Sequence, residues 1–428
     1  MAADSGITKS RPAYPPWVIL ITSFGTLVVI YGVWYSYSVF LVALVGEFGW
    51  SRSVVSGGFA FFSLMNALLG PPTGWLIRRW GPRRVILAGV GVMALGLCLT
   101  AETRAWWHLY VAYGLITGLG MSLNGWIPQV ILIQAWFPRR VGSAMGLATA
   151  GIGVGIFALV PLTQLMIEWY GWRWAFRLLA VLTVAWGLPS ALWWVRDPPG
   201  VTEGRSGPGP CRADDAAEAF WTLGAAVHTR RFWALCGMYF CGNAVTQMLM
   251  IHQVAYLVDH RMPALTAASV GGFVGLVSIG GKIGWGVLSD RTSRELACTL
   301  GFGCVLGSLG GLVLAGAYPG SPIVWGYAVL IALGYGVLSP VFPATASDLY
   351  RGPGFATIYG TLWAVVCLGL AAGPWIAGQV FDLTGSYVLA LWIGLAMALA
   401  TPVLVWIAAP RRPNIPPPAT RAEKMKGE

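Results

Sequence analysis

Lys282 is the residue of this sequence best suited to chemistry, because it is the one lysine or arginine in the middle of an apolar stretch. A charged ammonium near the centre of a bilayer costs roughly 2.5 to 3.5 kcal/mol on insertion scales, so it normally faces a cavity, a partner or a ligand. Such a fixed charge would attract a carboxylate. The alternative is a structural ammonium that bonds backbone carbonyls or reaches the nearer surface, about 12 Å away if the helix ends at Asp290.

Further polar residues interrupt the apolar stretches and could line a path beside this charge. Tyr335 lies between Gly334 and Gly336, where close approach of helix backbones can open a pocket. Tyr35 and Tyr37 are two residues apart and cannot share one helix face, and we choose Tyr35. The remaining candidates are Asn124, Ser339 and Trp363, followed by Gln129, Asn243 and Gln247. Trp363 would supply an apolar wall, and the polar candidates could instead link helices by hydrogen bonds.

Groups typical of enzymes are scarce. His252 titrates in a range useful for proton transfer, although a lone histidine is more often simply hydrogen-bonded. The sequence holds no HExxH, no GxSxG and no GxxxxGK[ST] phosphate loop, so we expect no enzyme. The seven cysteines show no paired metal spacing, and neither a disulfide framework, a metal site nor a cofactor is expected.

The elements that must position these residues are membrane-spanning helices. Hydrophobic residues make up 57% of the 428 residues and charged ones 10%, against roughly 25% charged in soluble domains. A run of about 20 apolar residues crosses a hydrocarbon core of about 30 Å as a helix. Twelve such runs predict an all-α integral membrane fold, with spans at 17–45, 52–77, 85–101, 106–137, 141–167, 172–195, 232–258, 266–289, 296–317, 322–349, 354–381 and 386–409.

The placement of charge predicts the orientation. A net charge of +11 could indicate nucleic acid, but most of the 27 lysines and arginines would lie on one side of the membrane. This is the positive-inside rule, and it places both termini and the middle loop in the cytoplasm, with the chain in the inner (plasma) membrane. The five basic residues expected at the outer side are Arg52, Arg104, Arg173, Arg177 and Arg261.

The chain divides into two similar halves. Residues 196–231 are rich in Pro, Gly and charge, as linkers are, and separate helical halves at 17–195 and 232–409, with tails at 1–16 and 410–428. One offset relates residues at matching places in the halves: Tyr113 and Tyr327, Gly120 and Gly334, Gly155 and Gly369, Glu168 and Asp382, Gly171 and Gly385. Two parallel six-helix repeats are typical of transporters whose halves rock about a site at their interface.

Two loops resemble the major facilitator superfamily. The stretch from Gly74 to Arg84, GWLIRRWGPRR, is similar to the signature between helices 2 and 3 of that family, and Gly286 to Arg294 is similar to its second copy. The resemblance implies the twelve-helix fold and a gating role for Gly74, Arg78, Arg79, Gly81, Arg83, Gly286, Asp290 and Arg291. Arg78 departs from the pattern, because the family usually has an acidic residue there that helps lock the cytoplasmic side.

A narrower resemblance is to the monocarboxylate and oxalate/formate branch of that family. It rests on YSYSVF at 35–40, EFGWSR at 47–52, WFPRR at 136–140 and the closing segment 373–387. The branch usually has arginine where Lys282 stands, and it implies that Asp259 works with this cation in proton coupling. Asp259 is about 40 Å along a straight helix from Phe232, near the outer mouth, so it could instead serve as a proton entry or outer gate group.

The eleventh predicted span, residues 354–381, indicates how many charges the substrate carries. Oxalate-type members of the branch carry a second cation in helix 11, whereas residues 354–381 contain no lysine or arginine. One fixed positive charge suits one carboxylate. A lysine also differs from arginine, because it is a point charge that can lose its proton when desolvated.

The sequence therefore predicts a secondary active transporter that moves a small organic anion, a monocarboxylate with a proton, by alternating access as a monomer. One alternative is a transporter of a larger amphipathic compound, with Lys282 as a structural charge. The other is a non-transporting sensor that signals through its cytoplasmic loop. A sensor would require a structured loop or tail, and both are composed like disordered segments.

Overall fold

The computed structural model describes residues 15–137, 141–196, 221–319, 321–350 and 355–408, and within them the chain is helical without strands. Twelve helical segments are long and apolar enough to cross a membrane. They match the twelve predicted spans, with ends that differ by four residues at most, so the all-α membrane fold is confirmed. The predicted tails and most of the linker lie outside the described residues.

The first six spans run from Pro16 to Trp194. They comprise α1 (Pro16–Phe48), α2 (Arg52–Trp80), α3 (Pro82–Ala101), a composite fourth span, α7 (Val141–Tyr170), and α8 (Trp172–Pro189) continued by the π-helix η2 (Ser190–Trp194). The fourth span consists of α4 (Trp106–Leu109), the π-helix η1 (Tyr110–Thr117), α5 (Gly118–Asn124) and α6 (Trp126–Trp136).

The last six spans follow the short helix α9 (Leu223–Val227), whose first turn is capped by the Thr222 side chain. They comprise α10 (Arg230–Asp259), α11 (Ala264–Arg291), α12 (Arg294–Ala317), α13 (Ile323–Gly336) continued by α14 (Leu338–Leu349), α15 (Phe355–Thr384) and α16 (Val388–Ala408).

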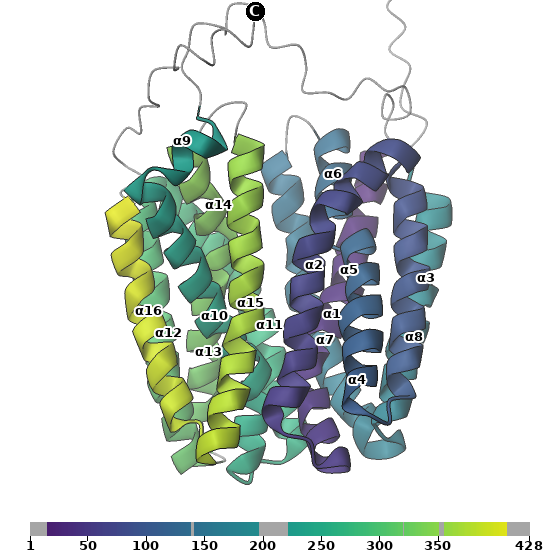
Figure 1. Cartoon of the computed structure of the whole chain (residues 1–428), viewed down its shortest axis with the longest axis vertical. Helices are drawn as coiled ribbons and strands as arrows, with labels where there is room; N and C mark the ends of the chain where they lie inside the picture. Colours follow the sequence, from purple (N-terminus) through teal and green to yellow (C-terminus); the bar gives the residue numbers. More distant parts are fainter. Residues whose placement is uncertain (1–14, 138–140, 197–220, 320, 351–354, 409–428) are drawn as a thin grey trace, which may run out of the picture.

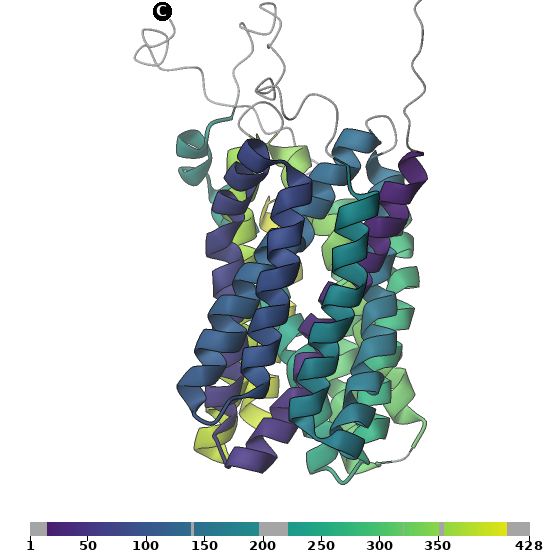
Figure 2. The same ribbon diagram turned by 90° about the vertical axis from the view of Figure 1, so that its right-hand side faces the viewer.

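The two sets of spans stand side by side in one bundle. In Figure 1 the helices up to α8 lie on the right and those from α10 onward on the left, with α7 and α11 near the middle. Figure 2, turned by a quarter, shows α1 beginning at the upper end, and Figure 1 shows α16 ending there. The end of the bundle at the top of these views is its upper end, and the opposite end is its lower end.

Matching glycines make matching contacts in the two halves. A Cβ on Gly155 of α7 would lie 2.2 Å from the carbonyl oxygen of Val28, and one on Gly369 of α15 would lie 2.6 Å from that of Phe240. In both halves the fifth helix thus packs closely on the first. Gly171 and Gly385 also share a positive φ, 84° and 68°, which favours glycine after a helix end.

The halves meet most extensively along two helix pairs, α7 with α11 and α2 with α15, and α1 also contacts α10. At the first pair, a Cβ on Gly153 would lie 2.6 Å from the Gly275 carbonyl oxygen, and one on Gly275 would lie 2.7 Å from the Gly153 oxygen. Small residues permit such backbone contact in lipid, where no hydrophobic force draws helices together. The glycines of the fifth span therefore set the distance between the halves here.

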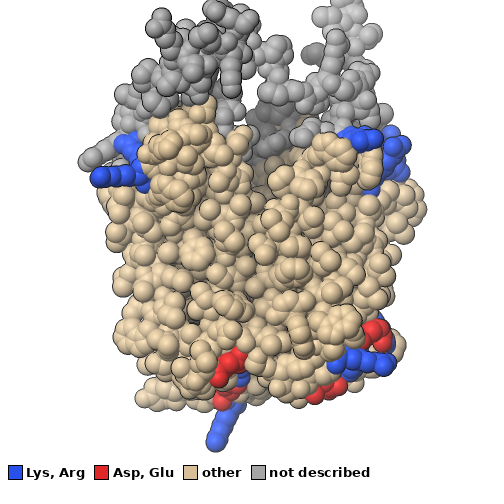
Figure 3. Space-filling model, viewed as in Figure 1, with Lys and Arg blue, Asp and Glu red and all other residues tan. Residues whose placement is uncertain are grey.

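On the outer face drawn in Figure 3, charged side chains gather at the two ends of the molecule. Figure 3 shows a wide belt without charged residues, basic side chains near the upper end, and acidic and basic ones together near the lower end. The same face is hollowed between the halves at the upper end. A charge-free belt of this kind is what a multi-pass membrane protein presents to lipid.

Candidate functional site

A cavity of about 140 Å³ lies between the two halves. Helices α1, α2, α6 and α7 contribute to its wall from one half, and α10, α13, α14 and α15 from the other. Nine of the lining side chains are aromatic: Tyr31, Trp34, Tyr35, Trp126, Tyr239, Tyr335, Phe342, Tyr359 and Trp363. Asn66, Asn243 and Ser339 add polar groups, and no charged residue occurs among the described residues that line it.

Tyr35 and Tyr335 join the two halves at this cavity. The Tyr35 hydroxyl donates a hydrogen bond of 3.0 Å to the Tyr335 hydroxyl, and the two rings meet edge to face. Tyr37, two residues along α1, lies in the first half and donates to the backbone carbonyl of Val55 at 2.6 Å. The helical spacing that separates the faces of Tyr35 and Tyr37 thus brings Tyr35 to the cavity.

Two glycines place Tyr335 between neighbouring helices. A Cβ on Gly334 would lie 2.5 Å from a Val305 methyl on α12, and one on Gly336 would lie 3.1 Å from the Lys282 backbone nitrogen on α11. The helix therefore fits tightly against both neighbours on either side of Tyr335. This close approach brings the Tyr335 ring next to the side chain of Lys282.

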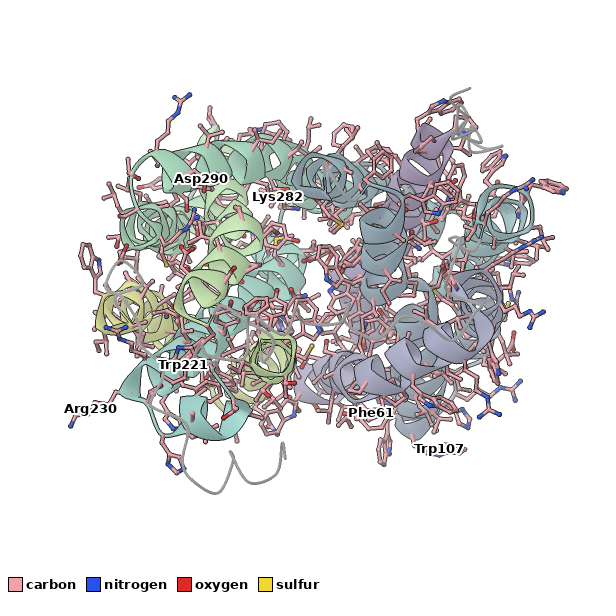
Figure 4. The ribbon with its side chains drawn as sticks, turned by 90° about the horizontal axis from the view of Figure 1, so that it is seen from above. Phe61, Trp107, Trp221, Arg230, Lys282 and Asp290 are labelled. Atoms are coloured by element: carbon pink, nitrogen blue, oxygen red, sulfur yellow. The ribbon has the colours of Figure 1, made fainter. Side chains whose placement is uncertain are left out.

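Lys282 lies one side chain behind the cavity wall. It is 9% exposed, and its Nζ is 4.9 Å from the centroid of the Tyr335 ring, a cation–π distance. Among the described residues Nζ has no hydrogen-bond partner. Figure 4 shows Lys282 near the boundary between the halves, whereas Phe61 and Trp107 lie at the periphery. A buried ammonium without an acceptor is costly, so this position favours an anion.

The other predicted lining residues divide into two groups. Ser339 and Trp363 line the cavity. Asn124 does not line it, since it is buried against Gly89 of α3 and its backbone carbonyl accepts a hydrogen bond from Gln129. Asn243 lines the cavity, and its side-chain amide donates to the Tyr239 carbonyl at 2.8 Å.

Trp126 and Trp363 face each other across the two halves. Their rings are nearly parallel, with centroids 6.3 Å apart and planes at 10°. Trp126 follows Gly125, where the fourth span breaks between α5 and α6. A Cβ on Gly125 would lie 2.4 Å from the Met121 carbonyl oxygen, so the break needs a glycine.

Arg52 is the centre of the contacts at the lower end. Its guanidinium forms an ion pair of 2.7 Å with Asp259, donates to the Tyr387 hydroxyl at 2.6 Å and lies 3.8 Å over the Phe381 ring. The Asp382 carboxylate also accepts from the backbone N–H groups of Arg52 and Ser53, at 2.8 and 2.7 Å. A carboxylate at a helix N-terminus is favourable. The lower ends of α2, α10 and α15 are thereby joined.

Asp259 therefore pairs with Arg52, and the ion pairs of the described residues do not join it to Lys282. The resemblance implies that Asp259 and Lys282 work together in proton coupling, and this arrangement places no direct contact between the two side chains. The physical reason is depth, because Asp259 is the last residue of α10 at the lower end and Lys282 is well inside α11.

His252 supports this lower network from inside α10. Its Nδ1 is 2.9 Å from the Tyr387 hydroxyl and its Nε2 is 2.8 Å from the Pro374 carbonyl oxygen. Because a carbonyl can only accept, Nε2 carries the hydrogen and Nδ1 accepts from Tyr387. Both ring nitrogens are then satisfied, and His252 holds the tyrosine that receives Arg52.

Two further ion pairs at the lower end stay within the first half. Arg173 contacts Glu47 at 3.2 Å, and Arg177 contacts Glu102 at 2.5 Å. The hydrogen bond from Arg177 lowers the pKa of the exposed Glu102 carboxyl. Three of the five arginines expected on the outer side are thus paired with acids.

The two signature loops make different contacts at the upper end. In the second copy, Arg294 binds both Asp290 at 2.5 Å and Asp348 at 3.0 Å, and so holds α11, α12 and α14 together. In the first copy, Arg83 donates to the Ala191 and Leu192 carbonyls at the end of span 6. Gly81, with φ 80°, forms the turn between α2 and α3.

The remaining predicted gating residues contribute less. Arg79 is exposed, 5.3 Å over the Trp75 ring, and Arg291 is also exposed. Gly74 has no contact within 4 Å of an added Cβ, and Gly286 faces Pro340 at 3.6 Å. The side chain of Arg78 lies outside the described residues.

Sequence reasoning missed several residues at the cavity and the lower end. Trp126, Tyr31, Trp34 and Tyr359 were not singled out because aromatic residues are frequent along the whole chain. Arg52 was interpreted only as an outer charge. The break at Gly125 before Trp126 was the local signal available for one of them.

Comparison with known proteins gives consistent matches. The family model described as Major Facilitator Superfamily matches residues 22–374. Monocarboxylate transporter 13 of Bos taurus is 29% identical over 394 residues, which cover 90% of this chain and 87% of the relative. Monocarboxylate transporter 3 of Rattus norvegicus is 28% identical, with 88% and 77% covered, and monocarboxylate transporter 11 of Homo sapiens is 27% identical, with 94% and 85% covered.

Proposed function

Because the chain belongs to the major facilitator superfamily and is related to its monocarboxylate transporters, we propose that it is a secondary active transporter of a monocarboxylate. The anion would be accompanied by a proton and would cross by alternating access about the cavity between the halves. The protein would act as a monomer in the plasma membrane, with its upper, basic end in the cytoplasm. It would not act as an enzyme.

The observation that carries this proposal is the state of Lys282. Its ammonium is buried and has no hydrogen-bond partner among the described residues. It lies against Tyr335, which lines the cavity. A carboxylate that enters the cavity and displaces the Tyr335 ring slightly would give Lys282 its counterion, and the low dielectric there would strengthen the pair.

The number of carboxylates on the substrate should match the number of fixed positive charges near the cavity. Helix α15, the eleventh span, contains no lysine or arginine. Lys282 would therefore neutralise one carboxylate, and a second one would be buried without a partner, at a cost of several kcal/mol. This supports a monocarboxylate over a dicarboxylate such as oxalate.

The lower network supports alternating access. Arg52 and Asp382 join α2 to α10 and α15, whereas the upper end is hollowed between the halves. The arrangement is the one expected of an inward-facing state. Breaking the contacts of Arg52 would let the halves part at the lower end, while the upper ends of the halves close.

For the proton we propose Asp259 as the exchanging group. Its carboxylate is 33% exposed at the lower end and is paired with Arg52. Protonation would remove the charge that holds this ion pair, so an acidic outside would favour opening of the lower end. His252 was also predicted for proton coupling, and its two satisfied ring nitrogens support a role in positioning Tyr387 instead.

A second candidate function is favoured by the cavity wall. Nine aromatic side chains would also suit a larger amphipathic compound, with Lys282 as a structural charge. The non-transporting sensor has no such observation in its favour.

The test is uptake of radiolabelled monocarboxylates into proteoliposomes that contain the purified protein or its Lys282→Gln variant. We expect the variant to lose between about tenfold and a hundredfold in apparent affinity, because a charge-assisted hydrogen bond contributes about 1.5–3 kcal/mol. The control is Lys282→Arg, which keeps the charge. Size-exclusion profiles in detergent check that each variant is folded.

Normal uptake by Lys282→Gln would remove Lys282 from the site and leave the amphipathic compound as the better proposal. Competition by oxalate as strong as that by lactate would contradict the argument from a single charge.

A further inference from the structure

The cavity is larger than a three-carbon acid requires. A water molecule needs about 10–15 Å³ of such space, so about 140 Å³ has room for about ten non-hydrogen atoms. Lactate has six. A substrate that fills this space would carry an apolar body of one ring beside its carboxylate.

The residues that line the cavity indicate which kind of apolar body the substrate has. Half of the lining residues are aromatic, and they surround the space from both halves. Flat aromatic faces interact favourably with another aromatic ring, through offset stacking or edge-to-face contact, more than with a saturated ring of equal size. The polar lining groups Asn66, Asn243 and Ser339 are neutral, so they add no second charge requirement.

Trp126 and Trp363 provide a specific place for a ring of the substrate to bind. Their indoles are parallel within 10° and their centroids are 6.3 Å apart. A ring sandwiched between two others needs about 7 Å between the outer ring planes, because carbon atoms in contact are about 3.5 Å apart. The centroid distance of 6.3 Å is an upper limit on the present separation of the planes, so the indoles must move apart to admit a ring. The two tryptophans belong to opposite halves, on α6 and α15, so a small separation of the halves would admit the ring. Both side chains are only half-buried, so their faces have room.

The charged end of the substrate has its own place. Tyr335, with Lys282 behind it, lies in the wall of the same cavity, and the Tyr35 hydroxyl binds the Tyr335 hydroxyl beside it. The cavity thus has a wall that is half aromatic, with one buried cation behind it.

We propose that the preferred substrate is a monocarboxylate with a flat aromatic body, whose ring lies between Trp126 and Trp363 and whose carboxylate is directed to Tyr335 and Lys282. The proposal rests on the proposed function, since it names the substrate class of the same site. It also gives the stacked pair a role in transport, because a ring held between the tryptophans connects the two halves.

The experiment compares labelled phenylacetate, cyclohexylacetate, lactate and neutral phenylacetamide, by uptake into proteoliposomes and by equilibrium binding in detergent. We expect phenylacetate to bind at least tenfold more tightly than cyclohexylacetate and lactate. Trp363→Leu and Trp126→Leu should each lower the ratio of phenylacetate to lactate affinity by at least fivefold, and Trp363→Phe should largely preserve it. The matched control is Trp107→Leu at the periphery, which should leave the ratio unchanged.

The outcomes separate this proposal from the one it rests on. If lactate is transported and phenylacetate binds no better than cyclohexylacetate, the aromatic substrate is overturned and the monocarboxylate transporter stands. If the ratio of phenylacetate to lactate affinity is unchanged in both Trp126→Leu and Trp363→Leu, binding of the ring between these two tryptophans is also overturned. If phenylacetamide binds as well as phenylacetate, or none of the four compounds binds, the proposed function fails with it.

Discussion

Arg52 shows how one residue can control one end of a membrane protein. Its backbone and side chain contact Asp259, Asp382, Phe381 and Tyr387, all from the other half. The Arg52–Asp259 pair is less exposed than the pairs of Arg173 and Arg177. Exposed pairs contribute about 0–1 kcal/mol, whereas partly buried bonds to charged groups contribute about 1.5–3 kcal/mol. Arg52 is therefore the stronger determinant of the closed lower end.

At this scale we predict the effect of Asp259→Asn on coupling. An asparagine cannot take up a proton and cannot form the charged pair with Arg52, so opening of the lower end becomes independent of external pH. Uptake down a substrate gradient should persist, and its stimulation by an inward proton gradient should fall at least fivefold. The measurement is uptake with and without the pH gradient.

Glu47→Gln is the matched control, because Glu47 forms its ion pair with Arg173 inside one half. It should retain full stimulation. Undiminished stimulation of Asp259→Asn would show that the proton binds elsewhere.

Breaks within helices position the residues of the cavity. The fourth span changes from α5 to α6 at Gly125, and the tenth from α13 to α14 at Val337. Trp126 directly follows the break at Gly125, and Tyr335 lies two residues before the break at Val337. Discontinuous helices are a recurring way to form binding sites in transporters, since the backbone there lines a cavity.

At the scale of the element we predict that Gly125→Ala damages the site more than the fold. Its Cβ would lie 2.4 Å from the Met121 carbonyl oxygen, so α6 must shift and carry Trp126 away from Trp363. Overpacking of this kind costs about 1–3 kcal/mol. Uptake and thermal unfolding in detergent measure the two effects.

The control for Gly125→Ala is Gly91→Ala, because an added Cβ at Gly91 meets nothing within 4 Å. This variant should unfold at the same temperature as the unaltered protein or slightly above it. Equal uptake by both variants would exclude a role for the break at Gly125 in shaping the cavity.

The whole molecule consists of two halves that repeat one another and differ where function requires it. Both halves pack their first and fifth spans together through glycines. Neither Lys282 of the second half nor Arg52 of the first half has a lysine or arginine at the matching position of the other half. At the α7–α11 contact, Gly153 and Gly275 bring the two backbones together, and the side chains of Ile279 and Ile156 pack directly over these glycines. Small residues permit such close packing of helices in lipid.

At this scale we predict that a link across the lower end stops transport. Ser53→Cys combined with Asp382→Cys, joined by a short crosslinker that forms a disulfide bond with each thiol, would hold α2 to α15 in the present arrangement. Uptake should fall at least tenfold on crosslinking and recover on reduction.

The control is the pair Glu47→Cys and Arg173→Cys, which links α1 and α8 within one half and should leave uptake unchanged by crosslinking. Transport that continues across a complete Ser53–Asp382 crosslink would contradict rocking of the halves.

The twelve spans, their arrangement as two repeats, and the family all follow from the amino-acid sequence. Span prediction succeeds because lipid requires about 20 apolar residues for each crossing, which is a property of composition within a single segment. The same reasoning identified Lys282, since a lone charge in an apolar run is visible without a fold. The choice of Tyr35 over Tyr37 agrees with the cavity because the helical period alone separates their faces.

Which residues contact one another depends on the packing of the helices. Asp259 pairs with Arg52, Asn124 packs on Gly89 away from the cavity, and Trp126 faces Trp363 across the two halves. These contacts join segments hundreds of residues apart or depend on the rotation of one helix against another, and neither is encoded in the apolar pattern of a single span. The physical reason is that hydropathy fixes the depth of a residue in the membrane, whereas its partners depend on close packing between helices.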